Sequence, residues 1–175
     1  MMRKKAVALL GSLVPALLAM PASAHVTLEV REAVIGSYYT AGLQVGHGCS
    51  GSPTKSVRVQ IPEGVSSVKP QPKPGWKVST VKAKLDVPLD NGHGGKITET
   101  VREVVWSGGR LLDEHYDVFA FRAKLPEKGG DVMYFPVVQE CEKGVNRWIE
   151  IPSAGKSRRE LKQPAAELKL LPKPQ

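Results

Sequence analysis

Short runs of alternating apolar and polar residues, separated by glycine and proline, constrain the fold of this chain more than any other feature. In the run VRVQI, the side chains of Val57, Val59 and Ile61 would point to one side of a strand, and the two polar side chains to the other. Phe119 and Phe121 alternate in the same way further along. Helical periodicity is missing between residue 25 and the tail. The pattern therefore predicts β-strands.

Eight runs have this strand character, and turn sequences such as GCSGSP, DNGHGGK and EKGGD separate them. They span residues 25–32, 37–45, 55–61, 76–82, 100–106, 116–125, 131–140 and 146–151. About seven or eight strands in a chain of this length predict an all-β protein, an antiparallel β-sandwich of immunoglobulin or fibronectin type. Pro136 lies inside one run, which indicates an edge strand or a bulge.

Residues 1–24 have the pattern of a cleaved export signal. Arg3, Lys4 and Lys5 precede the apolar run AVALLGSLVPALLAM, and Ala22-Ser23-Ala24 supplies the small residues of a cleavage site. The apolar run is shorter than the roughly twenty residues of a membrane-spanning helix. We expect the signal helix to be removed, leaving a periplasmic or secreted protein that begins at His25 and is not stably inserted in a membrane. A retained anchor helix is the alternative.

The composition changes after the last expected strand. Residues 25–152 form the predicted sandwich domain, and residues 153–175 are basic and rich in proline, with one weakly helical piece, PAAELKLL. We expect a solvated tail there, with electrostatic attachment to the cell envelope as the alternative. Three of the 25 Lys and Arg residues lie in the signal, so the remainder exceeds its 17 acidic residues by about five charges. This diffuse excess does not indicate a nucleic-acid-binding protein.

The two cysteines, Cys49 and Cys141, lie far apart in the sequence. In an exported chain an even number of cysteines favours a disulfide, here between the ends of the second and seventh strand runs. A thiolate metal site is the alternative, but the spacing is unlike C-x-x-C.

Sequence signatures of enzymes are missing. GCSGS does not satisfy G-x-S-x-G, and the chain has no phosphate-binding glycine loop, no H-E-x-x-H and no paired catalytic acids. The sequence therefore predicts a protein that is not an enzyme.

Among the four histidines, His25 has a special position. Cleavage after Ala24 would place a free α-amine on the same residue as the imidazole, and the amine and Nδ1 can close a six-membered chelate on one metal ion. Two such nitrogens suit tetragonal Cu(II). His47 could ligate a metal or lie beside the disulfide, His93 lies in a turn, and His115 could pair with a neighbouring acid.

The methionine content bears on the oxidation state of any bound copper. Met133 alone remains after cleavage of the signal, whereas Cu(I) carriers usually need clusters of thioether ligands. Copper bound here is therefore expected to be Cu(II).

Several segments together resemble the YcnI-like family of exported bacterial copper-binding proteins. They are AHVTLEVREAVIGSYYTAGLQVGHGC, GSPTKSVRVQIPEGV, KPGWKV, VVWSGGRL, FAFRAKLP and FPVVQECEKGVNRW, and the succession IPEGV, PGW, W-x-G-G and Q-x-C-x-x-G is specific. The resemblance implies a β-sandwich that binds Cu(II) through the N-terminal histidine, an arrangement called a monohistidine brace, with a carboxylate and a nearby tryptophan. It also implies a role as a copper chaperone or in copper acquisition, with another copper carrier or a copper transport membrane protein as partner.

Carried onto this chain, the resemblance implies His25, Glu32 and Trp148 as the metal site. Glu29 competes with Glu32, because in a straight strand it shares a face with His25, whereas a bend is needed to bring Glu32 back. Trp76 and Trp106 are expected to pack in the core or at turns.

Two other functions stay open on the sequence. One is a copper-dependent oxidase or monooxygenase, which would need a second histidine from His47, His93 or His115. The other is a metal-independent module of the envelope that binds another protein.

Overall fold

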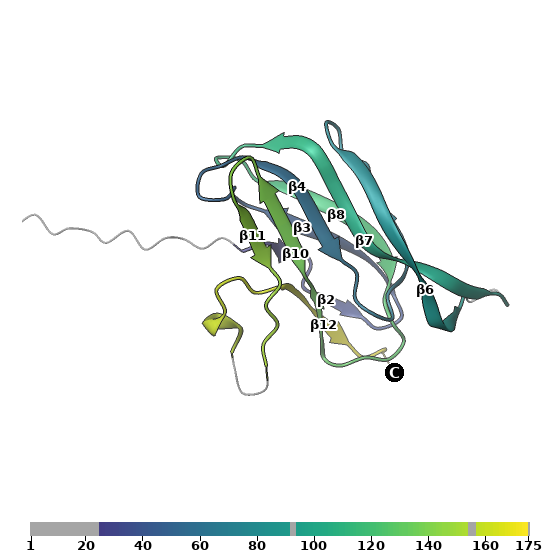
Figure 1. Ribbon diagram of the computed structural model, residues 1–175. Helices are drawn as coiled ribbons and strands as arrows, with labels where there is room; N and C mark the ends of the chain where they lie inside the picture. The colour runs from purple at the N-terminus through teal and green to yellow at the C-terminus, as the bar shows by residue number, and fades with distance from the viewer. Residues whose placement is uncertain (1–24, 92–93, 154–156, 175) are drawn as a thin grey trace, which may run out of the picture.

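The structure is a computed structural model that describes residues 25–91, 94–153 and 157–174. Strands account for nearly all of its regular secondary structure, with one 3-10 turn at Arg158–Glu160 (Figure 1). The strands are β1 Thr27–Leu28, β2 Glu32–Val34, β3 Tyr38–Val45, β4 Thr54–Gln60, β5 Ser66–Pro70, β6 Lys77–Asp90, β7 Lys96–Leu111, β8 Asp117–Lys124, β9 Val132–Phe135, β10 Val137–Cys141, β11 Val145–Trp148 and β12 Ala166–Leu171.

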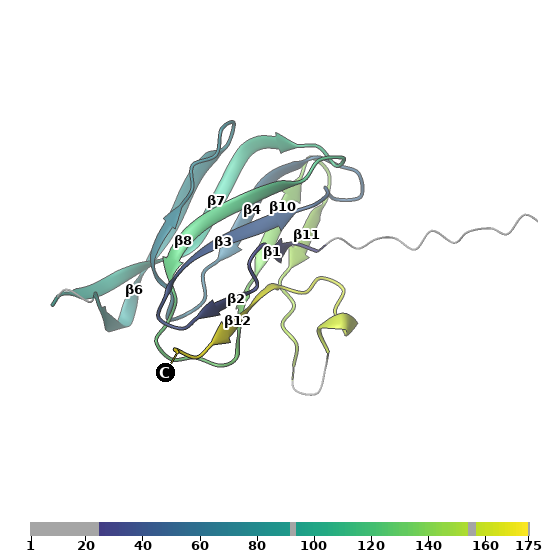
Figure 2. The same ribbon diagram turned by 180° about the vertical axis from the view of Figure 1, so that it is seen from behind.

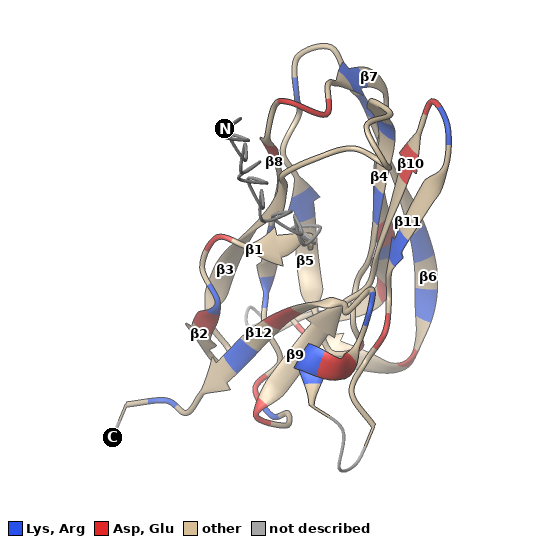
Figure 3. Ribbon diagram, turned by 90° about the vertical axis from the view of Figure 1, so that its left-hand side faces the viewer, with Lys and Arg blue, Asp and Glu red and all other residues tan. Residues whose placement is uncertain are grey.

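Two layers of antiparallel strands form a sandwich, which confirms the predicted fold class. One sheet has the order β1-β3-β8-β5 and the other the order β11-β10-β4-β7-β6. Figures 1 and 2 show the two sheets from opposite sides, and Figure 3 shows them edge-on. A third, small sheet, β2-β12-β9, lies at one end of the sandwich, and its β12 and β2 are parallel.

The core lies between the two layers and is built by the alternation seen in the sequence. Val57 and Val59 on β4 are fully buried, as are Phe119 and Phe121 on β8 to within 1%. Trp106 on β7 is also fully buried and packs edge-on against Phe119, with ring centroids 5.7 Å apart. The inward side chains of the two sheets therefore interdigitate, as in other aligned sandwiches.

Two expected strand runs are divided between sheets, which accounts for two of the four described strands beyond the eight predicted; the other two, β5 and β12, lie outside the predicted runs. The run 25–32 bends at Glu29 and Val30, so that β1 joins β3 while β2 joins β12. The run 131–140 is interrupted at Pro136, where the chain passes from β9 to β10. The sequence predicted an edge strand or a bulge at Pro136, and the structure places this residue in the break between the two strands.

The prediction of a helical piece near the C-terminus was wrong. Residues Ala166–Leu171 form β12, which pairs with β2 on one side and β9 on the other. Ala166 and Leu168 are fully buried. This part of the range 153–175 is therefore packed against the sandwich and is not a solvated tail.

The β6–β7 hairpin is longer than the sequence predicts. Its strands reach Asp90 and begin again at Lys96, and Figure 1 shows this pair extending beyond the body of the sandwich. Val81 and Val87 on β6 are exposed. Within the described ranges, no helix is both long and apolar enough to cross a membrane. The predicted signal, residues 1–24, and His93 lie outside the described residues.

Candidate functional site

The imidazole of His25 lies against the indole of Trp148 at the edge of the sandwich. The two ring centroids are 5.5 Å apart and the ring planes are inclined by 77°, an edge-on contact. Val26 and Leu28, each 1% exposed, anchor the chain that follows His25 in the core. The structure therefore brings together two of the residues that the sequence predicted for one site, although β1 and β11 lie near opposite ends of the sequence.

Trp148 is held by a buried glutamine. The indole is 4% exposed, and its Nε1–H donates to Oε1 of Gln139 at 3.1 Å. Gln139 lies on β10, is 1% exposed, and donates from its amide nitrogen to the His47 carbonyl at 2.6 Å and to Thr54 Oγ1 at 2.8 Å. Asn146 Nδ2 donates to the same Oε1 at 3.3 Å. Gln139 thus connects β11, β4 and the loop that carries His47.

His47 follows β3, and its ring contacts the same indole. Its ring centroid is 6.3 Å from that of Trp148, at an angle of 83°. Nδ1 of His47 is 2.5 Å from the Gly48 carbonyl, and because a carbonyl only accepts, Nδ1 must carry the proton. In the neutral ring Nε2 therefore has the lone pair. Nε2 is enclosed and has no hydrogen-bond partner among the described residues.

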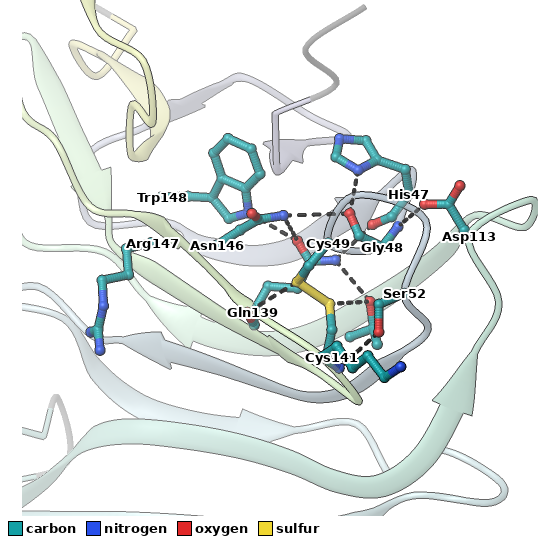
Figure 4. The surroundings of a disulfide bond; sticks show 12 residues. His47, Gly48, Cys49, Ser52, Asp113, Gln139, Cys141, Asn146, Arg147 and Trp148 are labelled. Atoms are coloured by element: carbon teal, nitrogen blue, oxygen red, sulfur yellow. Dashed lines mark hydrogen bonds between the residues drawn. A yellow bond between two sulfur atoms is a disulfide. The ribbon is translucent and has the colours of Figure 1, made fainter. Parts of the chain in front are cut away.

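The disulfide predicted between Cys49 and Cys141 is present. The sulfur atoms are 2.04 Å apart and the bond joins the His47 loop to the end of β10. A tight turn at Ser50 and Gly51, both with positive φ, closes the loop, and Cys49 and Ser52 exchange two backbone hydrogen bonds. Figure 4 shows the His47 ring and the Trp148 indole on the same side of this disulfide. Both sulfurs are used in the bond, so the alternative of a thiolate metal site does not apply.

The surroundings of His25 favour the neutral imidazole. Burial, then the positive charge of Arg158, and to a smaller extent His47, hold the pKa of His25 below its ordinary value, while a hydrogen bond to the Lys162 backbone acts in the opposite direction. A neutral imidazole is the form that binds metals. Arg158 and Lys162 come from the segment expected to be a solvated tail, and their approach to His25 was not predicted.

The segment that carries Arg158 contains a sequence motif that predicts a short helical turn. Ser157 accepts from the backbone of Arg159, and Glu160 accepts from the Ser157 backbone at 3.0 Å, forming a capping box. The sequence SRRE has the S-x-x-E spacing of this motif. The spacing could therefore have indicated the short turn, but not its position beside His25.

The two candidate carboxylates are engaged elsewhere. Glu32 begins β2 in the small sheet, and its Oε1 accepts from Lys169 Nζ on β12 at 3.0 Å. The carboxylate of Glu29 occupies the space that a Cβ on Gly42 would take. Burial, and second the charge of Glu29, raise the pKa of Tyr39 to about 12.

Neither carboxylate completes a metal site in the structure. Across the described ranges, no three or more His, Cys, Asp or Glu side chains are grouped so that they could hold a metal ion. The bend expected for Glu32 exists, but it leads to the ion pair with Lys169.

Trp76, Trp106 and His115 lie outside the cluster of His25, His47 and Trp148. Trp76 packs edge-on against Phe119, with ring centroids 4.9 Å apart, so the core positions predicted for Trp76 and Trp106 are confirmed. His115 is exposed and lies 3.8 Å from Glu114, one of the two acids that the sequence suggested.

Comparison with known proteins places the chain in a family. The model of the family described as a domain of unknown function, DUF1775, matches residues 25–170. The chain belongs to the DUF1775 family. The copper-binding protein CutI of Bacillus subtilis (strain 168) is 31% identical over 136 residues, which cover 77% of this chain and 60% of CutI. These findings confirm the YcnI-like resemblance, and the matched part of the DUF1775 chain spans 60% of the length of its curated relative.

A solved structure supports the fold of this DUF1775 chain. It is an uncharacterized protein from Nocardia farcinica, described as having an immunoglobulin-like fold. The likeness has a TM-score of 0.62 at 24% identity, and it covers 83% of this chain and 97% of the other. The immunoglobulin type of sandwich predicted from the sequence is thereby confirmed.

Proposed function

We propose that this protein is an exported, non-enzymatic Cu(II)-binding protein that holds copper in the periplasm and passes it to another copper carrier or a copper transport membrane protein. The observation that carries the proposal is the position of His25. It follows Ala22-Ser23-Ala24 directly, the family match begins at this residue, and its imidazole lies against Trp148. The relative CutI, named as a copper-binding protein, supports the choice of metal.

In this proposal the α-amine and Nδ1 of His25 bind the metal together once the signal has been removed. Trp148 shields one side of the ion, because its indole is buried and fixed by Gln139. The donor chemistry fits Cu(II), which favours nitrogen ligands in a tetragonal arrangement. Nε2 of His47, which is enclosed and has no hydrogen-bond partner among the described residues, is a further feature that fits a metal.

The carboxylate of the proposed site is Glu32, with Glu29 as the alternative. Glu32 would have to leave Lys169 to reach the metal, because the two side chains form an ion pair at 3.0 Å. Such a surface ion pair is worth less than about 1 kcal/mol, so breaking it costs little. This oxygen ligand would give the site an anionic donor beside its neutral nitrogens.

The test compares two forms of the protein that differ only in the α-amine of His25. One form begins at His25. The other has about five Gly and Ser residues before it, so that its N-terminal amine is too far from His25 to bind a metal together with the imidazole of that residue. Titration with Cu(II) against a competing chelator should give one tight equivalent for the first form. The extended form and His25→Ala should lose it.

Equal tight binding by the extended form would overturn the proposal, because the amine would then have no role. Circular dichroism of the three proteins without metal serves as the control for folding. His115→Ala is the matched histidine control, since His115 is exposed and its imidazole lies beside Glu114.

A copper-dependent oxidase is the second candidate, and one observation favours it. Such sites add a second histidine to the brace, and His47 is the histidine that contacts the same indole as His25. Turnover of peroxide by the copper-loaded protein, above the rate of the His25→Ala protein, would support this function. A rate equal to that of His25→Ala would exclude it.

A further inference from the structure

His47 has the hydrogen bonding of a metal ligand. Ligating histidines usually donate their other ring N–H to a carbonyl or carboxylate, which selects the tautomer and orients the ring. His47 does this through Nδ1 to the Gly48 carbonyl, so that Nε2 presents its lone pair. Gly48 itself is fixed, because its N–H donates to Asp113 Oδ1 at 2.9 Å.

The lone pair on Nε2 is not used by any described residue. The atom is enclosed, and a buried polar atom without a partner costs about 1–3 kcal/mol. Buried polar groups in proteins are normally satisfied, so an unpaired atom of this kind calls for a ligand, a water or an ion. A bound metal ion would satisfy it directly.

The position of His47 is held by groups that do not depend on a metal. The His47 carbonyl accepts from Gln139, and Cys49, two residues on, is joined to Cys141. The Trp148 ring makes edge-type contacts with both His47 and His25, with centroid distances of 6.3 and 5.5 Å. The two imidazoles thus belong to one cluster around one indole.

We propose that Nε2 of His47 is a second imidazole ligand of the metal that His25 binds. The inference rests on the proposed function and deepens it, because the site would then have three nitrogen donors: the α-amine and Nδ1 of His25, and Nε2 of His47. Imidazole nitrogen is a suitable ligand for copper.

The experiment uses the protein that begins at His25, loaded with one equivalent of Cu(II). Pulsed electron paramagnetic resonance detects the remote nitrogen of each coordinated imidazole and so counts the imidazoles. Two are expected in the natural protein and one in His47→Phe. Phenylalanine keeps an aromatic ring beside Trp148 while removing both nitrogens. The affinity for Cu(II) should fall at least about tenfold, the range seen when supporting groups of a metal site are lost.

His115→Phe is the matched control and should retain both imidazoles and the full affinity. A second variant, His47→Gln, protects the test against a folding defect, since it keeps a polar side chain in the loop. Thermal unfolding without metal shows which variants are folded. A folded His47→Gln protein with one coordinated imidazole supports the proposal.

The outcomes separate the two proposals. One coordinated imidazole in the natural protein, with unchanged affinity in His47→Phe, overturns the role of His47 and leaves the His25 site intact. A protein that begins at His25 and binds no Cu(II) overturns both.

Discussion

The nitrogen donors and the oxygen donors of the proposed site are held in different ways. His25 and His47 contact a tryptophan that is 4% exposed, and the glutamine that fixes this indole is 1% exposed. Glu32, in contrast, is exposed and paired with Lys169, and Glu29 is exposed beside Gly42. The fold thus preorganises the imidazoles and leaves the carboxylates to surface contacts. Preorganised groups lose less free energy on binding a metal, so the affinity should depend more on the imidazole end.

The largest expected effect is on the disulfide that supports the imidazole end. The double substitution Cys49→Ala and Cys141→Ala opens a connection between residues 92 apart in sequence. The free energy of unfolding should fall by about 2–5 kcal/mol, because the unfolded chain is no longer restricted by a long closed loop. Urea denaturation measures the change. A loss of less than about 1 kcal/mol would show that the hydrogen bonds of Gln139 hold the loop without the disulfide.

Gln139→Leu tests those hydrogen bonds next. The substitution leaves the His47 carbonyl, the Thr54 hydroxyl and the Trp148 N–H without their partner in a buried place. Each unsatisfied group costs about 1–3 kcal/mol, so a loss of roughly 3 kcal/mol is expected in the same urea experiment.

Gln60→Leu is the matched control for Gln139→Leu. Gln60 lies on β4 and is exposed, so its replacement should change the free energy of unfolding by no more than about 0.5 kcal/mol. Similar losses for the two variants would mean that leucine itself, rather than the broken network, destabilises the sandwich.

A feature could be predicted from the sequence when residues close together in the chain determine it, and could not when residues far apart in the chain determine it. Alternation is local, so β4 and β8 could be predicted from Val57, Val59, Phe119 and Phe121. The choice of sheet is not local. The bend at Glu29 sends β2 to a different sheet from β1, and no glycine or proline marks it.

The strand β12 was missed for a related reason. Ala166, Leu168 and Leu170 do alternate, and all three are buried, but the surrounding Ala, Glu, Leu and Lys residues favour helix. Pairing with β2 and β9 overrides this local preference. For the site, the cleavage pattern pointed to His25 and the resemblance to Trp148. The contribution of His47 depends on Gln139 and the disulfide, which act across long separations.

Trp148→Phe should have a smaller effect on stability and a distinctive effect on fluorescence. The ring contacts with His25 and His47 are kept, but Gln139 loses one donor, which should cost about 1–2 kcal/mol. Cu(II) quenches the emission of an adjacent indole, so most of the copper-dependent quenching should disappear in this variant. Trp76→Phe should keep the quenching, because Trp76 packs against Phe119 instead. Loss of quenching in Trp76→Phe alone would place the metal elsewhere.

The smallest effects are expected at the carboxylate end, and their sign is the informative part. Glu32→Gln and Lys169→Met each break the exposed ion pair, and each should change the free energy of unfolding by less than about 1 kcal/mol. If Glu32 binds the metal, the two substitutions act in opposite directions on the Cu(II) affinity. Glu32→Gln removes a ligand and lowers the affinity, whereas Lys169→Met removes a competitor and raises it. Both changes should stay below about tenfold, or 1.4 kcal/mol, because the carboxylate is not preorganised. Equal affinities in competition titrations of both variants would remove Glu32 from the site, and a loss confined to Glu29→Gln would assign the carboxylate to Glu29.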